Sequence, residues 1–187
     1  MSEQSVLPIM GFCAPSGTGK TTLMAQVINA LSQMGVRVAA IKHGHHAADV
    51  DKAGKDSQRF RTAGANAVIF SGPERWFLIE ELPQKKAPDL QQQVQLLRDL
   101  GGYDLILIEG YKNENHPKIA VVRKGVTKQT AFKNLSHIVA VAVDEAMEIW
   151  PDPPKGEEGW DQLPVLSLNA PAQVAQFIQD YFQRSDT

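Results

Sequence analysis

Short apolar runs alternate with longer amphipathic segments along the first half of the chain. The first run, 6–13, precedes a glycine-rich loop and is expected to form a buried strand. The segment that follows, 20–34, repeats apolar residues such as Leu23 and Val27 with the 3.6-residue period of a helix. A later run, 104–108, is apolar after its first residue, which is typical of a strand buried on both faces. This alternation predicts a sheet whose strands are connected by helices.

The same alternation extends to the end of the chain. Further strands are predicted at 36–41, 67–70, 75–82, 119–123, 137–143 and 165–168. Helices are predicted at 55–63, at 89–100 and after Asn169, which is expected to cap the last helix. The segments 124–133 and 150–160 are expected to be loops, because polar residues, prolines and glycines interrupt the pattern there. We therefore predict an α/β fold over 1–187, a single three-layer domain whose mainly parallel sheet is flanked by helices on both faces.

The loop between the first strand and the first helix matches the Walker A pattern of phosphate-binding loops. Gly17 and Gly19 allow successive backbone N–H groups to converge on an anion, and the helix N-terminus adds its positive partial charge. Lys20 is expected to reach the β- and γ-phosphates, and the Thr21 hydroxyl to ligate Mg²⁺. The residues expected to contact the nucleotide here are Ser16, Gly17, Thr18, Gly19, Lys20, Thr21 and Thr22. The alternative, an ordinary Gly/Ser turn, does not explain the Gly-Lys-Thr triplet in this setting, so we predict a P-loop nucleotide-binding domain.

A second acidic position lies at the end of the run 104–108. There Glu109 places a carboxylate at the tip of a buried strand, followed by Gly110, which leaves room for backbone near a ligand. A carboxylate in this position holds the water shell of Mg²⁺ in nucleotide-hydrolysing proteins, although Asp is more common there. We predict that Glu109 acts with Lys20 and Thr21; the alternative is a strand-terminal Glu that faces solvent.

A segment rich in histidine and aspartate follows the second predicted strand, beginning Lys42-His43-Gly44-His45-His46. Because the carboxyl ends of strands face the ligand crevice in such folds, this segment is expected beside the triphosphate. Lys42 and Arg59 are expected to neutralise phosphate charge, and His43 to donate to phosphate. Asp49 or Asp51 is expected to bind Mg²⁺ or to position an attacking water, which makes Asp51 a candidate metal-binding and catalytic residue. A zinc site on the histidines and a solvated loop without chemistry stay open as alternatives.

The residues alone leave the choice of base open. The Asn-Lys-x-Asp signature of many GTPases is absent. Asp144 follows the run 137–143, where it could accept from the N1–H and exocyclic amine of guanine, but the pattern favours an ordinary strand-end Asp. GTP and ATP therefore both remain candidates at this point.

Composition and charge narrow the class of protein further. The 187 residues carry a formal net charge of −2, so no basic surplus favours nucleic acid or an anionic membrane. The single cysteine, Cys13, excludes an intramolecular disulfide. Residues 1–6 lack the features of a signal peptide, and no run reaches the length of a membrane span. We expect a cytoplasmic protein.

Four motifs follow the phosphate loop in a specific order. Together with that loop they are Ser16-Gly-Thr-Gly-Lys-Thr-Thr-Leu23, Lys42-His-x-His-His46, Asp51-x-x-Gly-Lys-Asp-Ser57, Ala63-Gly-Ala65 and Glu109-Gly-Tyr-Lys112. This series resembles the MobB-type family of molybdopterin-guanine dinucleotide biosynthesis adapter proteins. The resemblance runs from about residue 8 to residue 123 and continues more weakly to the last helix. Gly44, where a small hydroxyl residue is expected, and the segment 150–160 depart from the family pattern.

The resemblance implies GTP, Mg²⁺, a homodimer and weak intrinsic hydrolysis. It also implies as partners the guanylyltransferase that joins GMP to molybdopterin and molybdopterin-binding enzymes. Onto matching positions it carries phosphate binding by residues 17–22 and polar site roles for Asp51 and Glu109. Slow turnover fits a sequence with no Gln or arginine finger in a recognisable context. The chain is thus expected to be at most a slow GTPase.

Two other functions remain open from the sequence. A small-molecule or nucleotide kinase has a similar phosphate loop, and the basic residues of 112–133 are compatible with a lid over phosphates. A nucleotide-dependent metallochaperone would use the histidine cluster to deliver a metal.

Overall fold

The structure, a computed structural model, describes residues 7–44, 56–82, 89–144, 151–152 and 160–184. It divides into two compact units, one formed by 1–43 with 90–187 and the other by 44–89. The two units are described separately below. The single domain predicted over 1–187 stays a prediction.

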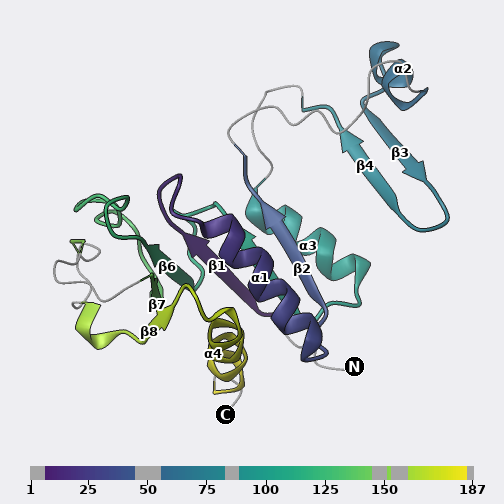
Figure 1. Cartoon of the computed structure of the whole chain (residues 1–187). Coiled ribbons are helices and arrows are strands. Elements are labelled where there is room, and N and C mark those ends of the chain that lie inside the picture. Colours follow the sequence, from purple (N-terminus) through teal and green to yellow (C-terminus); the bar gives the residue numbers. More distant parts are fainter. Residues whose placement is uncertain (1–6, 45–55, 83–88, 145–150, 153–159, 185–187) are drawn as a thin grey trace. The chain divides into compact units, whose positions relative to one another are not determined.

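A six-stranded sheet forms the centre of the first unit (Figure 1). Its strands are β1 (Ile9–Cys13), β2 (Val38–Lys42), β5 (Leu105–Glu109), β6 (Lys118–Val122), β7 (Ile138–Val143) and β8 (Val165–Ser167). Their order is β2-β5-β1-β6-β7-β8, and every pairing among them is parallel. Because β1 lies between β5 and β6, the carboxyl ends of these three strands meet at the loop that follows β1. The predicted α/β fold with a mainly parallel sheet is confirmed.

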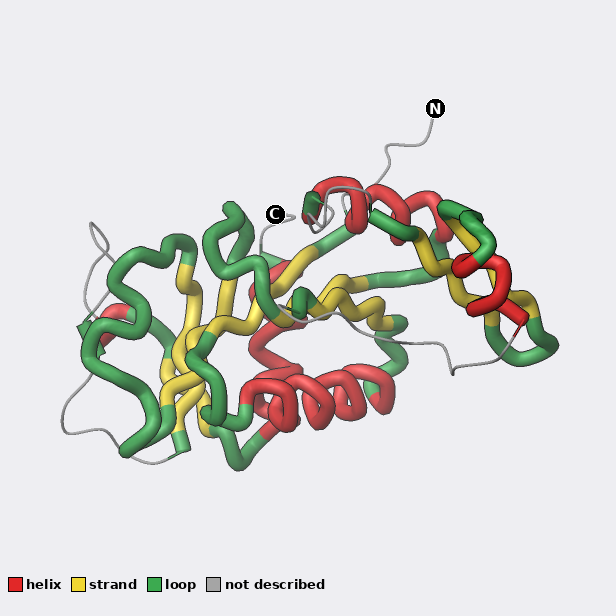
Figure 2. Tube along the Cα trace, turned by 90° about the horizontal axis from the view of Figure 1, so that it is seen from above, coloured by secondary structure: helices red, strands yellow, loops and turns green. Residues whose placement is uncertain are grey.

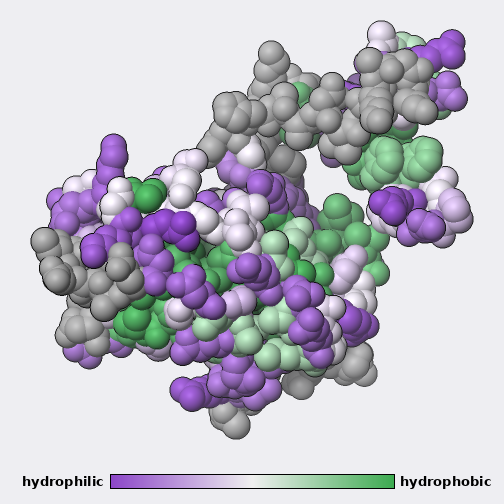
Figure 3. All heavy atoms as spheres, viewed as in Figure 1, coloured by the Kyte–Doolittle hydropathy of each residue, from purple (hydrophilic) through white to green (hydrophobic). Residues whose placement is uncertain are grey.

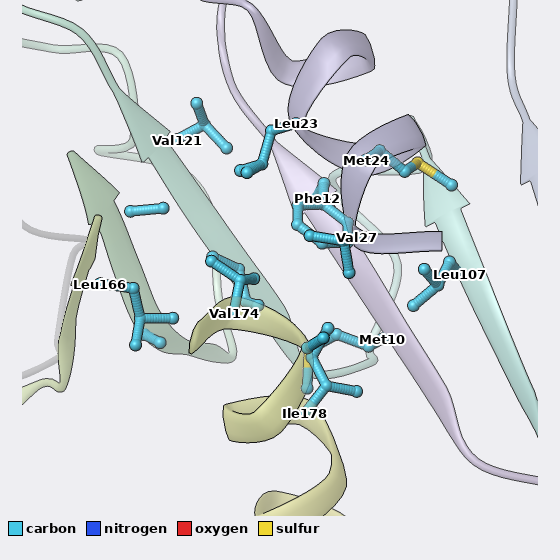
Figure 4. Packing of buried hydrophobic residues seen from close by; sticks show 14 of the residues in the cluster. Met10, Phe12, Leu23, Met24, Val27, Leu107, Val121, Leu166, Val174 and Ile178 are labelled. Carbon is cyan, nitrogen blue, oxygen red and sulfur yellow. The ribbon is translucent and has the colours of Figure 1, made fainter. Parts of the chain in front are cut away.

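Helices cover both faces of this sheet (Figure 2). They are α1 (Lys20–Gln33), α3 (Leu90–Leu100) and α4 (Pro171–Gln183), with a short 3₁₀ helix, η1 (Trp160–Gln162). On one face α1 and α4 pack together and bury Leu23, Val27 and Ile178 against Met10 and Phe12 of β1 (Figure 4). Each such buried side chain contributes about 1.5–3 kcal/mol, so this cluster holds α1 firmly behind the loop that precedes it.

The opposite face has two coverings. Over β2 and β5, α3 buries Leu90 and Val94 against alternate residues of those strands. Over β6 and β7, the covering comes from Phe132 and Trp160, whose rings meet edge to face at 5.5 Å between centroids. These two aromatic residues belong to segments predicted as polar loops. These segments therefore do more than connect strands, since each supplies a core side chain to this face of the sheet.

Each predicted strand and helix is present in the described residues, with boundaries shifted by a few positions. The prediction that Asn169 caps the last helix is wrong. The N-cap of α4 is Ala170, with no side-chain cap, and Pro171 begins the helix. Asn169 instead donates from Nδ2 to the backbone carbonyl of Asp144, which ties the end of β8 to the end of β7.

The second unit consists of α2 (Asp56–Thr62) and an antiparallel hairpin of β3 (Ala67–Ser71) and β4 (Trp76–Glu80). The hairpin exposes a large apolar surface, and Figure 3 shows hydrophobic side chains on it. Ile69 lies opposite Leu78, next to Trp76 on the same face, and their exposed fractions are 63%, 44% and 51%. A two-stranded hairpin is only marginally stable alone, and contiguous exposed apolar side chains are typical of contact surfaces.

Two ionisable side chains are buried in the first unit where the chain enters β6. Lys118 is fully buried, and its ammonium group donates to the backbone carbonyls of Glu114, His116 and Ser136. The imidazole of His116 lies nearby against Gly11, where a Cβ would meet the ring. Among the residues that the structure describes, neither ring nitrogen of His116 finds a hydrogen-bond partner. Burial, reinforced by the positive charge of Lys118, lowers the pKa of His116 from its ordinary 6.5 to about 4.

This lowered pKa predicts that the folded chain loses stability in mild acid. The unfolded chain takes up a proton on His116 below about pH 6.5, whereas the folded chain resists it until about pH 4. One pKa unit corresponds to about 1.4 kcal/mol; allowing for screening by nearby solvent, we expect a loss of about 2 kcal/mol between these pH values. Urea unfolding across this range measures it.

The matched control is His116→Gln, which cannot titrate. Its free energy of unfolding should lack this component of the pH dependence. The low pKa of Asp104, about 2 because of its hydrogen bonds to Arg37, affects stability only at lower pH, since its contribution is lost as the pH falls from about 4. If the free energy of unfolding fell equally steeply with pH for the wild type and His116→Gln between pH 6.5 and 4, the account would be contradicted.

Candidate nucleotide-binding site

The loop between β1 and α1 has the backbone of a phosphate cradle. Gly17 and Gly19 have φ values of 82° and 86°, a region that residues with a Cβ adopt rarely. Gly19 is the N-cap residue of α1, and no side chain caps this helix end. The Gly19 carbonyl accepts a hydrogen bond from the N–H of Leu23. Thr18 is buried and its hydroxyl donates to the carbonyl of Pro15 at 3.0 Å, which ties the loop to itself. The first amides of α1 therefore lie at the loop, where they can meet an anion.

Glu109 lies beside this loop, as the sequence predicts. It is the last residue of β5 and lies in register with Phe12, the second-to-last residue of β1. The Thr21 hydroxyl donates to Glu109 Oε1 at 2.8 Å, and Lys20 Nζ lies 3.7 Å from the same oxygen. The Glu109 side chain is only 13% exposed. The first two residues of α1 and the strand-tip carboxylate thus form one cluster.

Lys42 joins this cluster from the other neighbour of β5. It ends β2 in register with Glu109, and its Nζ lies 3.5 Å from Glu109 Oε2. Glu109 therefore has a lysine near each of its oxygens. A buried carboxylate is stabilised by such partners, and the two lysines bring positive charge to the edge of the loop.

His43 packs against the residues that follow Glu109. Its backbone N–H donates to the carbonyl of Glu109 at 2.8 Å, and its ring lies 4.5 Å from that of Tyr111, centroid to centroid. Gly110 has a φ of 104°, and a Cβ there would lie 2.6 Å from the His43 Cβ. The room left by Gly110 is thus occupied by His43.

Asp144 lies just beyond the end of β7, with its carboxylate directed to residues that follow β6. Its Oδ1 accepts from the backbone N–H of Lys124 at 3.2 Å, and its Oδ2 lies 3.7 Å from Arg123 Nε. Recognition of a guanine base by Asp144 stays a prediction.

Arg123 is the residue that the sequence reasoning missed at this site. The sequence indicates only that it belongs to a basic segment, 112–133, compatible with a lid over phosphates. The structure places Arg123 Nη2 3.3 Å from the position that a Cβ on Gly19 would occupy. The sequence places Arg123 at the end of a predicted strand, but only the strand order of the structure puts that strand next to β1, where the carboxyl ends converge on the loop.

Several predicted residues cannot be placed at the site. His45, His46, Asp49 and Asp51 lie outside the described residues. Arg59 belongs to the second unit, where it is 76% exposed and pairs with Asp56 at 3.6 Å. Ser16 and Thr22, in contrast, lie at the site, where both are exposed, Ser16 on the loop and Thr22 in the first turn of α1. Across the ranges that the structure describes, no three His, Cys, Asp or Glu side chains are grouped to hold a metal ion.

None of the described helices combines the length and apolar character needed to cross a bilayer.

Comparison with known sequences identifies relatives over the whole chain. A family model described as "Molybdopterin guanine dinucleotide synthesis protein B" matches residues 9–144. The chain is 35% identical over 187 residues to the molybdopterin-guanine dinucleotide biosynthesis adapter protein of Escherichia coli (strain K12), covering 100% of this chain and 99% of the relative. It is 37% identical over 175 residues to the protein of the same name in Haemophilus influenzae, covering 94% and 89% of the two chains.

Solved structures show the same fold. The crystal structure of Bacillus subtilis MobB gives a TM-score of 0.67 at 21% identity, covering 92% of this chain and 96% of that one. A MobB protein homolog from Bacillus stearothermophilus gives 0.62 at 26% identity, covering 95% and 97%. With a matching family model and full-length relatives above 30% identity, the chain belongs to the MobB family of molybdopterin-guanine dinucleotide biosynthesis adapter proteins.

Proposed function

We propose that this chain is a GTP-binding adapter with weak Mg²⁺-dependent GTPase activity that assists guanylyl transfer to molybdopterin. The observation that carries the proposal is the cluster of Lys20, Thr21 and Glu109 beside the phosphate loop. These are the three groups that a P-loop protein needs to hold a triphosphate and its metal ion. Family membership favours the adapter role over the kinase and the metallochaperone.

The phosphate chain would lie against the loop amides, where positive groups surround it. The N-terminus of α1 contributes partial charge, and Lys20 and Lys42 contribute full charges. Both lysines now pair with Glu109 at 3.7 and 3.5 Å, distances longer than a hydrogen bond. Phosphate oxygens would offer them closer partners.

The oxygen atoms present at the site fit Mg²⁺. Thr21 Oγ1 and Glu109 Oε1 lie 2.8 Å apart, and a hydroxyl and a carboxylate are ligands that this ion accepts together with phosphate oxygens and water. The bound ion would neutralise charge on the β- and γ-phosphates. We propose Asp51 as a third polar residue of this site from its position in the family motif, together with a role in positioning water.

Glu109→Gln tests the metal role. The amide keeps an acceptor for the Thr21 hydroxyl but removes the negative charge, so the gain in GTP affinity caused by Mg²⁺ should fall by at least about 10-fold. Binding without Mg²⁺ should change little or improve, because the negative charge no longer faces phosphate. Titration calorimetry with Mg²⁺ and with EDTA measures both values. Equal losses in the two conditions would argue against a metal ligand at Glu109.

We also propose that the chain acts as a homodimer. The apolar residues exposed on the β3–β4 hairpin support this, because a second copy would cover them. Sedimentation equilibrium should then give about twice the 20.5 kDa mass of one chain. A single-chain mass at micromolar concentration would refute the dimer and leave the hairpin to another partner.

The adapter role is tested with the partner enzyme. A purified molybdopterin guanylyltransferase is supplied with molybdopterin, Mg²⁺ and GTP, and the guanine dinucleotide product is followed with and without this chain. We expect faster product formation with the wild-type chain and no stimulation with Lys20→Ala. An unchanged rate in the presence of the wild-type chain would contradict the adapter proposal.

A further inference from the structure

Arg123 approaches the phosphate loop from the side opposite Glu109. Glu109 ends β5 and Arg123 follows β6, and these strands flank β1 on its two sides. A Cβ on Gly19 would have Arg123 Nη2 as its nearest neighbour, at 3.3 Å. The guanidinium group therefore lies at the residue that caps α1, where the loop amides can meet an anion.

The turn that carries Arg123 is held in place. The backbone N–H of Arg123 donates to the Thr127 hydroxyl at 2.9 Å, and the N–H groups of Val126 and Thr127 donate back to the carbonyl of Arg123. Val126 Cγ1 lies 4.0 Å from the position of a Cβ on Gly17. The turn thus approaches the loop at both of its left-handed glycines, so Arg123 is presented by a preorganised backbone.

The charge of Arg123 is only partly matched by the protein. Asp144 Oδ2 lies 3.7 Å from Nε, beyond hydrogen-bond distance, while Oδ1 accepts from the N–H of Lys124. Arg123 Nε is buried without an acceptor in the described part of the chain. A guanidinium group offers five N–H donors in a planar fork suited to phosphate. A phosphate oxygen at the loop would meet the Nη2 end of this fork, which is the end that lies nearest Gly19.

We propose that Arg123 is a phosphate-binding residue that contacts the α/β end of the nucleotide, and that Asp144 positions its guanidinium group. This inference rests on the proposed nucleotide-binding function. The α/β end is favoured because the loop amides cradle those phosphates, whereas the lysine that follows Gly19 reaches the β- and γ-phosphates. Arg123 should therefore contribute to GDP and GTP binding alike, which separates it from an arginine that acts on the γ-phosphate.

The test compares Arg123→Gln with Lys128→Gln. Lys128 is exposed on the same connection, five residues further along the chain, so its variant removes the same charge at another position. Binding of GDP and of GTP is measured by calorimetry in Mg²⁺. Arg123→Gln should weaken both by about 10- to 100-fold, as expected for one charge-assisted hydrogen bond. Lys128→Gln should stay within about 2-fold, and Arg123→Lys should recover part of the loss.

A double-mutant cycle tests the positioning role of Asp144. Asp144→Asn keeps an acceptor for the Lys124 N–H and removes the charge that faces Arg123. It should weaken GDP and GTP binding by several-fold in the wild-type background and have little effect in Arg123→Gln. Its ratio of GTP to ITP affinity should match that of the wild type, because ITP lacks only the exocyclic amine. If Asp144→Asn changed the ratio of GTP to ITP affinity, Asp144 would instead contact the guanine base.

Three outcomes overturn the inference. The first is GDP and GTP affinities of Arg123→Gln within 2-fold of the wild type, when its thermal unfolding matches the wild type. The second is a loss confined to GTP, which would place Arg123 at the γ-phosphate. The third is a folded wild-type chain that binds neither GDP nor GTP. Only this outcome overturns the proposed function together with the inference about Arg123.

Discussion

Replacing Lys20 by alanine should weaken Mg²⁺-dependent GTP binding by at least about 100-fold. The side chain is 17% exposed and lies between the loop and Glu109, where it would reach two phosphate groups. Its loss removes a cation from a partly enclosed site and leaves the Glu109 carboxylate facing phosphate. Calorimetry or a fluorescent GTP analogue measures the change in affinity.

The fold should survive this substitution. The ion pair of Lys20 with Glu109 spans 3.7 Å and keeps contact with solvent, so its removal should change the free energy of unfolding by less than about 1 kcal/mol. Lys128→Ala, on an exposed part of the same unit, is the matched control for loss of charge. Wild-type affinity in a folded Lys20→Ala variant would mean that the nucleotide site lies elsewhere.

Replacing Lys118 by methionine should destabilise the chain by about 3 kcal/mol or more. Methionine has a similar length, but it cannot donate to the carbonyls of Glu114, His116 and Ser136, which Lys118 Nζ reaches at 2.6–3.0 Å. Buried carbonyl oxygens left without donors cost about 1–3 kcal/mol each. The segments that enter β6 and β7 would lose their common anchor. Equilibrium unfolding in urea measures the loss.

Lys133→Met is the control for this experiment. It makes the same chemical change at an exposed lysine, so the stability should stay within about 0.5 kcal/mol of the wild type. If the two variants unfolded at the same urea concentration with the same slope, Lys118 would not be the anchor that its contacts indicate.

Hydrophobic pattern alone predicted the elements of both units well. The run ending in Glu109 is continuous because successive residues of β5 enter different cores: Leu107 packs with α1 and α4, and Ile108 with α3. The periodicity of 20–34 reflects one buried face of α1. These hydrophobic patterns are local features of the sequence, and the contacts formed in the folded chain favour the same strands and helices. At Asn169 the local rule failed because the side chain found a partner at the end of β7.

The core of the candidate site was predictable because its chemistry is encoded in short motifs. Thr21, Lys20 and Glu109 meet as expected. Arg123 and Asp144 belong to no recognisable sequence motif. They pair because β6 and β7 are neighbours in the sheet, and the sequence does not reveal the order of the strands. The pairing of the strands within 44–89 cannot be derived from the sequence for the same reason. Its strands β3 and β4 look like those of the main sheet by pattern, and only pairing distinguishes them.

The most direct test of the account is the Mg²⁺-dependent affinity of the purified chain for GTP and for ATP, with hydrolysis followed in the same samples. The account predicts that GTP binds more tightly than ATP, that Mg²⁺ strengthens GTP binding, and that turnover is slow. Preference for ATP, or equal affinity for the two nucleotides, would contradict a GTP-binding adapter.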